Sequence, residues 1–213
     1  EYLVNQTKKL VEGGVKEIIL VAQETTLYGV DLYGKKSLPK LLHNLGLIEG
    51  LEWIRILYCY PEEINDELIA IKNEPKVCHY LDMPIQHASD NILKRMGRRT
   101  SKQELTDIVA KLRREIPDIA LRTTLITGFP GETDVDHEEV MQFIDECEFD
   151  RLGVFTYSRE EDTPAYDFEK LYAENKETLL GRYIEKFAGC EEGSVEYCAL
   201  CEGVEALLTG NRG

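Results

Sequence analysis

The sequence predicts an α/β fold in which helices cover a parallel β-sheet. Apolar runs of strand length alternate with segments whose apolar residues have helical spacing, and this alternation produces five predicted strands. Strands separated by such helices are joined by right-handed crossovers, which makes the strands parallel and leaves the helices outside. A chain of 213 residues with 43% hydrophobic residues is long enough to bury one good-sized core.

The predicted strands are short, nearly continuous aliphatic runs, which is the pattern expected where both faces of a parallel strand are covered. The clearest run is Glu17 to Ala22, in which four successive residues are aliphatic. The other predicted strands are residues 53–57, 77–81, 119–126 and 151–156.

The predicted helices alternate with these strands and carry their own start and stop signals. Residues 2–12 stop at a pair of glycines, as a glycine-terminated helix does. Ser89 is expected to cap a helix that runs through Met96, and Ser101 with Glu104 has the spacing of a capping box. The other helices are predicted over residues 38–45, 64–69 and 133–147.

The remaining choice is between a barrel and an open sheet. No Gly-x-Gly-x-x-Gly follows the first strand and no Gly-Lys-Ser/Thr stands at a strand end, so neither a dinucleotide fingerprint nor a P-loop favours the open, doubly wound form. A TIM-like barrel of βα units is therefore favoured. In such barrels the functional side chains gather at the carboxyl ends of the strands.

The acidic composition limits the classes of partner. Forty acidic residues against twenty-five basic ones give a net charge of −15, which repels a phosphate backbone and attracts basic partners. Direct binding of nucleic acid is therefore disfavoured. The densest basic cluster, residues 94–102, is expected to consist of cations solvated at a helix C-terminus, and a nucleic-acid patch is the alternative.

Neither a membrane span nor an export signal is expected. No run approaches the roughly 18 apolar residues that a spanning helix needs, and the first residues lack a basic region followed by an apolar stretch. A cytoplasmic protein is the expectation. Because the chain does not begin with Met and its first segment has a helical pattern, we expect an internal fragment or a trimmed chain.

Polar clusters follow two of the predicted strands. Residues 23–29 follow the first strand, where they either line a ligand pocket or form an ordinary turn with hydroxyl caps. After the third strand, Gln86, His87 and Ser89 place an amide, an imidazole and a hydroxyl at a helix start, which suits a ribose or a carboxylate. We expect His87 itself to be a structural hydrogen-bonding residue, because no partner constellation marks it as a base.

The last two predicted strands end in segments that suit a flat, uncharged ligand. Residues 122–133 combine Arg122 with a glycine-rich turn into a capped helix, and glycines allow close approach of the backbone. Glu132 near the helix start competes with an anion, so an adenine edge is favoured over a phosphate. Phe155 either flanks such a base or packs in the core.

Four of these strand-end segments together resemble the radical S-adenosylmethionine methylthiotransferases. The segments are residues 22–29, 84–89, 122–133 and 155–158. The match runs in order over roughly residues 1–166, which we predict to be the core domain. The resemblance implies a partial (βα)6 TIM-like barrel that lacks its first strand.

Within that family, the chain is most similar to the branch that modifies a small-subunit ribosomal protein. The similarity lies in residues 23–26, 60–64, 122–124 and 163–166. It implies transfer of a methylthio group to the β-carbon of an aspartate in the basic ribosomal protein S-twelve, with S-adenosylmethionine and two [4Fe–4S] clusters as cofactors. The alternative is the sister branch that modifies an adenosine in tRNA.

The resemblance also assigns residues to the methionine half of S-adenosylmethionine. Gln23 occupies the place where this superfamily meets the methionine amino group. Gln86 and Ser89 would face the ribose or methionine part, and Arg122 would face the methionine carboxylate.

A second group of residues is assigned to the adenine half. Ile126 and Gly128 would contact the adenine, and Phe155 and Tyr157 would form the far wall of its pocket. These residues belong to the segments that carry the resemblance.

The chain departs from the family in the residues that hold the radical cluster. The family's Cys-x-x-x-Cys-x-x-Cys spacing does not occur, and three thiolates with an open iron site are needed to bind S-adenosylmethionine there. We therefore expect this chain alone to be catalytically inactive. The missing first strand also leaves residues 17–22 as an unprotected apolar edge, which invites pairing with another copy.

From residue 167 the chain leaves the family pattern. We predict a C-terminal helix over residues 167–189 and an acidic, cysteine-containing tail over residues 190–213. Cys190, Cys198 and Cys201 are weak candidates for metal ligands, so a non-catalytic metal-binding or partner-binding module is a further alternative. The other cysteines lie in apolar segments and are expected to be buried thiols: Cys59, Cys78 and Cys147.

Overall fold

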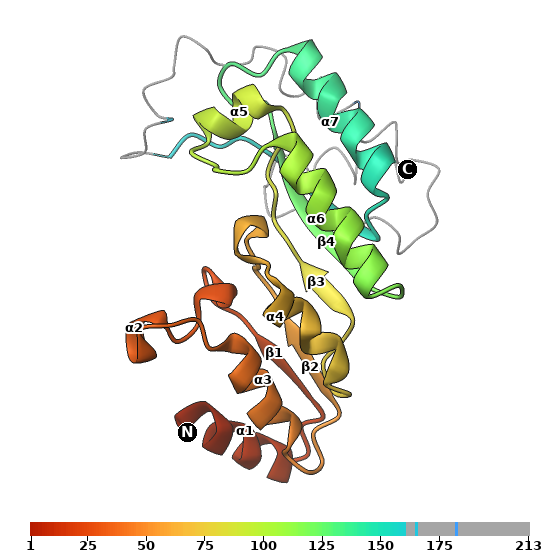
Figure 1. Ribbon diagram of the computed structural model, residues 1–213. Coiled ribbons are helices and arrows are strands. Elements are labelled where there is room, and N and C mark those ends of the chain that lie inside the picture. Colours follow the sequence, from red (N-terminus) through yellow and green to blue (C-terminus); the bar gives the residue numbers. More distant parts are fainter. Residues whose placement is uncertain (161–164, 166–181, 183–213) are drawn as a thin grey trace, which may run out of the picture. The chain divides into compact units, whose positions relative to one another are not determined.

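The computed structural model describes residues 1–160, 165 and 182, and Figure 1 shows the order of their helices and strands. The chain divides into two compact units. The first unit consists of Glu1–Pro84 and Ile108–Leu121, and the second consists of Ile85–Asp107 and the described residues from Arg122 onward. The cysteine tail, including Cys190, Cys198 and Cys201, lies outside the described residues.

The first unit begins as the sequence predicts, with a helix followed by alternating strands and helices. Short 3-10 turns, labelled η, join several of these elements. In chain order they are α1 (Tyr2–Glu12), β1 (Glu17–Leu20), η1 (Thr25–Leu27), α2 (Val30–Tyr33), α3 (Leu38–Gly46), β2 (Trp53–Ile56), η2 (Pro61–Glu63), α4 (Asp66–Ile69), η3 (Ala70–Asn73) and β3 (Tyr80–Asp82).

Parallel pairing organises the strands of this unit. β1 pairs with β2 in a register that runs from Glu17 opposite Trp53 to Leu20 opposite Ile56. A further parallel bridge joins Ile54 to Val77, just before β3. The predicted parallel α/β arrangement is therefore confirmed, although the described strands form two sheets, β1-β2 and β3-β4-β5, and no closed barrel.

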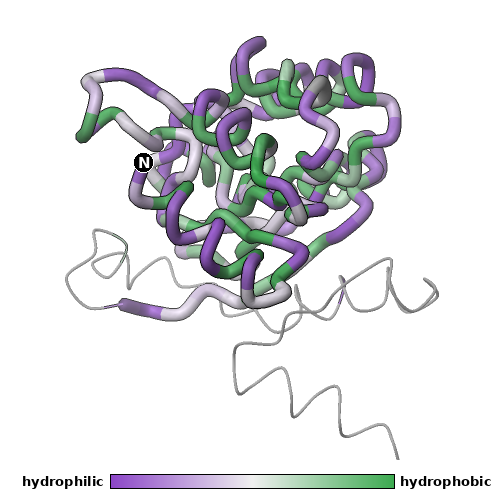
Figure 2. The backbone as a smooth tube through the Cα atoms, turned by 90° about the horizontal axis from the view of Figure 1, so that it is seen from below, coloured by the Kyte–Doolittle hydropathy of each residue, from purple (hydrophilic) through white to green (hydrophobic). Residues whose placement is uncertain are grey.

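Helix α3 supplies much of the core of the first unit. Its helical spacing places four leucines on one buried face, and α3 packs against β2, α1 and α4 (Figure 1). Hydrophobic and hydrophilic positions alternate along the helices in the same way, as Figure 2 shows. The buried leucines are Leu38, Leu41, Leu42 and Leu45, each at most 7% exposed.

Strand β1 forms an edge of its sheet, because β2 is the only strand paired with it among the described residues. Ile19 and Val21 are 51% and 58% exposed, although both are aliphatic. Beside them lies a cavity of about 540 Å³ between β1, α1 and α3, lined by side chains that include Leu3 and Leu10. These observations agree with the predicted apolar edge at residues 17–22.

The second unit continues the alternation. It contains α5 (Asp90–Arg95), β5 (Arg151–Thr156) and α7 (Asp134–Cys147), and it shares α6 (Lys102–Glu115) and β4 (Ala120–Thr127) with the first unit along the chain. β4 and β5 are parallel, with Thr124 opposite Gly153 and Ile126 opposite Phe155.

Local signals fixed the starts of two helices in this unit, and the third start differs from expectation. Thr133 and Asp136 form a complete capping box at the start of α7, and Ser101 and Glu104 exchange the hydrogen bonds expected of one. Ser89 occupies the position before α5, but its side chain makes no cap bond. The prediction that Ser89 caps this helix is wrong, because its hydroxyl donates to Asp136 instead.

Three further expectations concern one strand, three cysteines and the absence of a membrane-spanning helix. The strand predicted over residues 77–81 is observed only as the short β3. Cys59 and Cys147 are buried thiols as predicted, whereas Cys78 is only partly buried. Among the described residues, no helix combines the length and apolar character needed to cross a membrane.

Candidate functional site

A cavity of about 510 Å³ lies in the second unit, near the carboxyl ends of β4 and β5. This volume is in the range of sites that bind cofactors and other small molecules. Four of the residues predicted to bind the cofactor line it together: Gln86, Ile126, Phe155 and Tyr157. The remaining lining residues are Arg95, Met96, Gly97, Thr124, Phe129, Thr156, Ser158 and Ala165.

The alternation of side chains along β4 creates one wall of this cavity. Residues 121, 123, 125 and 127 are buried, whereas Arg122, Thr124 and Ile126 on the opposite face are only partly buried. Thr124 and Ile126 line the cavity, and their cross-strand neighbours are Gly153 and Phe155. The two strands therefore present one continuous partly open face to a ligand.

Aromatic and aliphatic groups form another wall. The rings of Phe129 and Tyr157 meet edge to face, with their centroids 5.1 Å apart and their planes at 75°. They cluster with the buried Ile92, and the partly buried Met96 and Ile126 pack against this cluster. An apolar wall with fixed aromatic rings suits the faces of a flat base such as adenine.

Gln86 contributes a strained backbone to the same site. Its φ is 69°, in the left-handed region that few non-glycine residues adopt. The conformation is held because the Gln86 N–H donates to the Thr124 carbonyl and the Gln86 carbonyl accepts from the Ile126 N–H, both at 2.8 Å. This backbone joins the loop to β4 and holds the Gln86 side chain at the cavity.

Two glycines in the turn after β4 have backbone conformations that favour glycine. Gly128 and Gly131 have φ values of 72° and 88°. A Cβ on Gly131 would overlap the guanidinium of Arg95. From the sequence, Arg95 was expected at a solvated helix end, with a nucleic-acid patch as the alternative, and the structure shows that its side chain also lines the cavity. Nothing in the sequence distinguishes Arg95 from the other basic residues within 94–102.

The other predicted residues lie in different surroundings, and their roles remain predictions. The Arg122 guanidinium donates to the Thr124 hydroxyl at 3.3 Å, on the face of β4 that borders the cavity. Ser89 is 2% exposed, and its hydroxyl donates to Asp136 at 2.5 Å. Gln23 lies exposed in the first unit, in the turn after β1.

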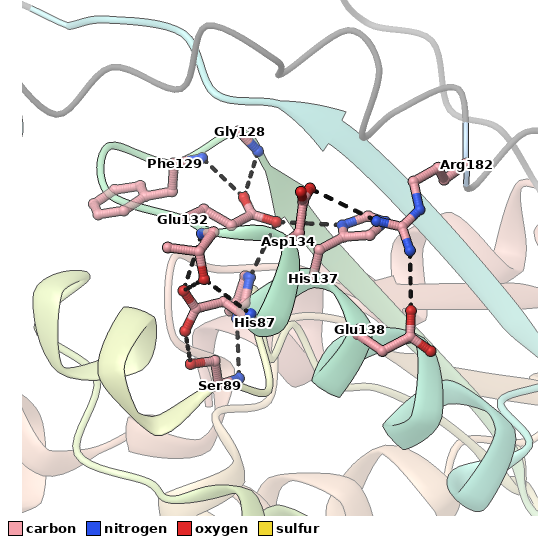
Figure 3. Close-up of polar contacts among 11 residues, drawn as sticks. His87, Ser89, Gly128, Phe129, Glu132, Asp134, His137, Glu138 and Arg182 are labelled. Atoms are coloured by element: carbon pink, nitrogen blue, oxygen red, sulfur yellow. Dashed lines mark hydrogen bonds and ion pairs between the residues drawn. The ribbon is translucent and has the colours of Figure 1, made fainter.

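Behind the cavity wall lies a buried cluster of two imidazoles and one carboxylate: His87, Glu132 and His137 (Figure 3). His87 and His137 are fully buried and Glu132 is 5% exposed. The cluster confirms that His87 is a structural hydrogen-bonding residue, because the Ser89 N–H donates to His87 Nδ1 at 3.0 Å. Sequence reasoning missed the partnership of Glu132 with His137.

The environment of Glu132 keeps its carboxyl ionised. Burial by itself would raise the pKa, but hydrogen bonds from His137 and His87 and from the Gly128 N–H outweigh it and lower the pKa to about 2. The charge near the start of α7 is thus permanent at neutral pH. It disfavours an anion there, in agreement with the preference for an uncharged adenine over a phosphate.

A family model described as the radical SAM superfamily matches residues 1–144, more than half of the chain. The chain belongs to the radical SAM superfamily. Within the described residues no group of three or more His, Cys, Asp and Glu side chains could hold a metal ion.

Curated relatives share much of the sequence. A protein named ribosomal protein uS12 methylthiotransferase RimO from Lachnoclostridium phytofermentans is 70% identical over 166 residues, which cover 78% of this chain and 38% of the relative. A protein of the same name from Clostridium botulinum strain Okra is 47% identical over 96% of this chain and 48% of its own length. The chain thus spans less than half of the length of these relatives.

Solved structures support the fold at low sequence identity. The radical S-adenosylmethionine methyltransferase TsrM from Kitasatospora setae, solved with cobalamin and a [4Fe–4S] cluster, has a TM-score of 0.59 at 16% identity and covers 76% of this chain and 30% of its own. Coproporphyrinogen III oxidase (HemN) from Escherichia coli has a TM-score of 0.58 at 14% identity, over 88% of this chain and 46% of its own.

The left-handed backbone of Gln86 predicts an inverted order of glycine and alanine variants. We expect Gln86→Gly to exceed Gln86→Ala in free energy of unfolding by about 1 kcal/mol, because glycine has no Cβ penalty at positive φ. Gln142 is exposed within α7. There the alanine variant should have the higher free energy of unfolding, by about 1 kcal/mol over the glycine variant. Urea denaturation of the four variants measures both differences, and the same order at both positions would contradict the strain.

The lowered pKa of Glu132 predicts a pH-dependent contribution to stability. A carboxyl whose pKa falls from 4.5 to about 2 on folding stabilises the native state by about 3 kcal/mol above pH 4.5. This stability is lost as the pH falls toward 2. Chemical denaturation should therefore show a gap between the wild type and Glu132→Gln that is widest near neutral pH and narrows below about pH 4.5.

The matched control for this titration is Glu138→Gln, which removes an exposed carboxylate of α7 that pairs with Arg182. Exposed ion pairs contribute about 0 to 1 kcal/mol, so this variant should stay close to the wild type at every pH. A gap for Glu132→Gln that did not change with pH would rule out an ionised, stabilising carboxylate.

Proposed function

We propose that this chain supplies the S-adenosylmethionine-binding core of a methylthiotransferase that modifies ribosomal protein uS12, the S-twelve protein of the small subunit. The observation that carries the proposal is the 70% identity, over 78% of the chain, to a relative of that name. The 510 Å³ cavity is consistent with it, because it unites four residues assigned to the cofactor independently of any structure.

Different residues at the cavity suit different parts of S-adenosylmethionine. Ile126, Phe129 and Phe155 offer apolar and aromatic surface for the adenine. Gln86 offers an amide to the ribose or methionine part. Arg122 is not among the lining residues, but it is partly buried on the same face of β4 and would offer a cation to the methionine carboxylate. Together these residues would bind and orient the adenosyl group.

The residues of this chain fit S-adenosylmethionine and do not fit the iron–sulfur clusters. The Cys-x-x-x-Cys-x-x-Cys spacing is absent from the sequence, so the proposal assigns no cluster ligand to it. Bound next to a reduced cluster, S-adenosylmethionine would be the source of the radical chemistry. The role of this chain is to place the adenosyl group for that chemistry and to screen it from water.

The charge of the chain favours a basic protein as substrate over a nucleic acid. A net charge of −15 attracts cationic proteins and repels phosphate backbones. We infer a cytoplasmic location for the same enzyme, because the ribosomal substrate is assembled there.

The decisive test is anaerobic reconstitution of the full-length gene product, followed by mass analysis of ribosomal protein uS12 and of tRNA from the same reaction. We expect one methylthio group on an aspartate of uS12. A gain on tRNA alone would move the assignment to the tRNA-modifying branch. A loaded enzyme that modified neither would leave only the superfamily and the fold.

The exposed edge of β1 also leads us to propose that the 213-residue chain self-associates. Light scattering on this chain should show a mass that rises with concentration, and Ile19→Lys should suppress the rise because it places a charge on the open edge. Leu47→Lys, at a position that is 71% exposed away from this edge, is the control and should change nothing. A monomer at high concentration would contradict the proposal.

A further inference from the structure

We propose that Glu132 is a positioning residue for the cofactor: its carboxylate fixes the two loops, residues 86–89 and 128–131, that carry the cavity-lining Gln86 and Phe129. The inference rests on the proposed binding of S-adenosylmethionine in this cavity and deepens it. None of the three side chains in the cluster is among those that line the cavity. Glu132 would act on the cofactor only through the loops it holds.

One oxygen of Glu132 holds the loop at the end of β4. Oε2 accepts from the Gly128 N–H at 2.5 Å and from the Phe129 N–H at 3.1 Å. Two successive amides are thus directed at one carboxylate oxygen, as Figure 3 shows. The ring of Phe129 lines the cavity and makes an edge-to-face contact with Tyr157.

The other oxygen faces the loop that carries Gln86. Oε1 lies 3.5 Å from His87 Nε2 and 3.4 Å from His137 Nδ1. The Ser89 N–H donates to His87 Nδ1, so the proton of the neutral ring is on Nε2, the nitrogen that faces Glu132. The N–H of Ser89, in the same loop as His87, therefore fixes the tautomer in which the Nε2 proton of His87 faces the Glu132 carboxylate.

A second carboxylate ties that loop to the start of α7. Asp136 Oδ1 accepts from the Ser89 hydroxyl at 2.5 Å, and Oδ2 accepts from the N–H and the hydroxyl of Thr133. Burial would raise the pKa of Asp136, but the bonds from Ser89 and Thr133 lower it. Loop 86–89 therefore contacts two carboxylates: Glu132, which precedes α7, and Asp136, which lies in the first turn of α7.

A buried charge is costly unless it is fully paired, and an apolar replacement would often serve stability as well. The charge serves geometry here, because a single carboxylate accepts hydrogen bonds from two amides of one loop and lies 3.5 Å from the imidazole nitrogen of another. Sites that bind ligands depend on such supporting contacts to keep the lining side chains in place. This is the physical reason for assigning Glu132 to positioning.

The test is the affinity of the full-length gene product for S-adenosylhomocysteine, measured by titration calorimetry at a temperature where every variant is folded. Glu132→Gln keeps the shape but removes the charge, and we expect the Kd to rise about 10-fold. His137→Leu removes one donor and should also raise the Kd. His137→Asn retains a donor at the place of Nδ1 and should restore binding close to that of the wild type.

Two controls separate positioning from general stability. Phe143→Leu loosens the fully buried core contact of α7, and Glu138→Gln removes an exposed carboxylate from the same helix. Both should leave the Kd unchanged. A purely structural role for Glu132 would leave the Kd of folded Glu132→Gln unchanged too, and that result would overturn the inference.

The remaining outcomes are also decisive. If Glu132→Gln does not fold, the histidine variants decide: a Kd raised in His137→Leu and restored in His137→Asn supports the inference, and equal affinities overturn it. If the wild type itself does not bind S-adenosylhomocysteine, the proposed function fails and the inference fails with it. Wild-type binding with unaffected variants leaves the proposed function intact and overturns only the positioning role.

Discussion

The buried carboxylate of Glu132 joins two loops whose residues line the 510 Å³ cavity of the second unit. Its two oxygens receive the amides of Gly128 and Phe129 on one side and face two histidines on the other. A buried charge is costly unless hydrogen bonds satisfy it, and here the N–H groups of Gly128 and Phe129 supply such bonds. The chain therefore uses an ionised group to shape a pocket whose own walls are mostly apolar.

Much of the fold could be predicted from the sequence because its signals are local. Aliphatic runs located the strands, and β5 was predicted at its observed bounds, Arg151–Thr156. The capping pairs at Ser101 and Thr133 lie within a few residues of their partners, so spacing alone revealed them. Ser89 failed as a predicted cap because its hydroxyl bonds to Asp136, far along the chain, and no local pattern encodes that competition.

Half of the eight residues assigned to the cofactor line one cavity, and the other half are not among its lining residues: Gln23, Ser89, Arg122 and Gly128. Gln86, Ile126, Phe155 and Tyr157 were assigned from resemblance and do share one cavity. The positive φ of Gln86 could not be read from the sequence, because glutamine gives no sign of a left-handed backbone. The contribution of Arg95 was hidden for a different reason, since only tertiary structure distinguishes it from the basic residues around it.

The alternation of burial along β4 carries a consequence for how the gene can change. Buried and partly buried residues alternate one by one along the strand, and two of the partly buried ones, Thr124 and Ile126, line the 510 Å³ cavity. Point substitutions on the cavity face can vary ligand recognition while the core face stays intact. Loss or gain of a single codon within the strand would exchange the two faces over every residue beyond it, so the length of β4 is constrained more tightly than the composition of its partly buried face.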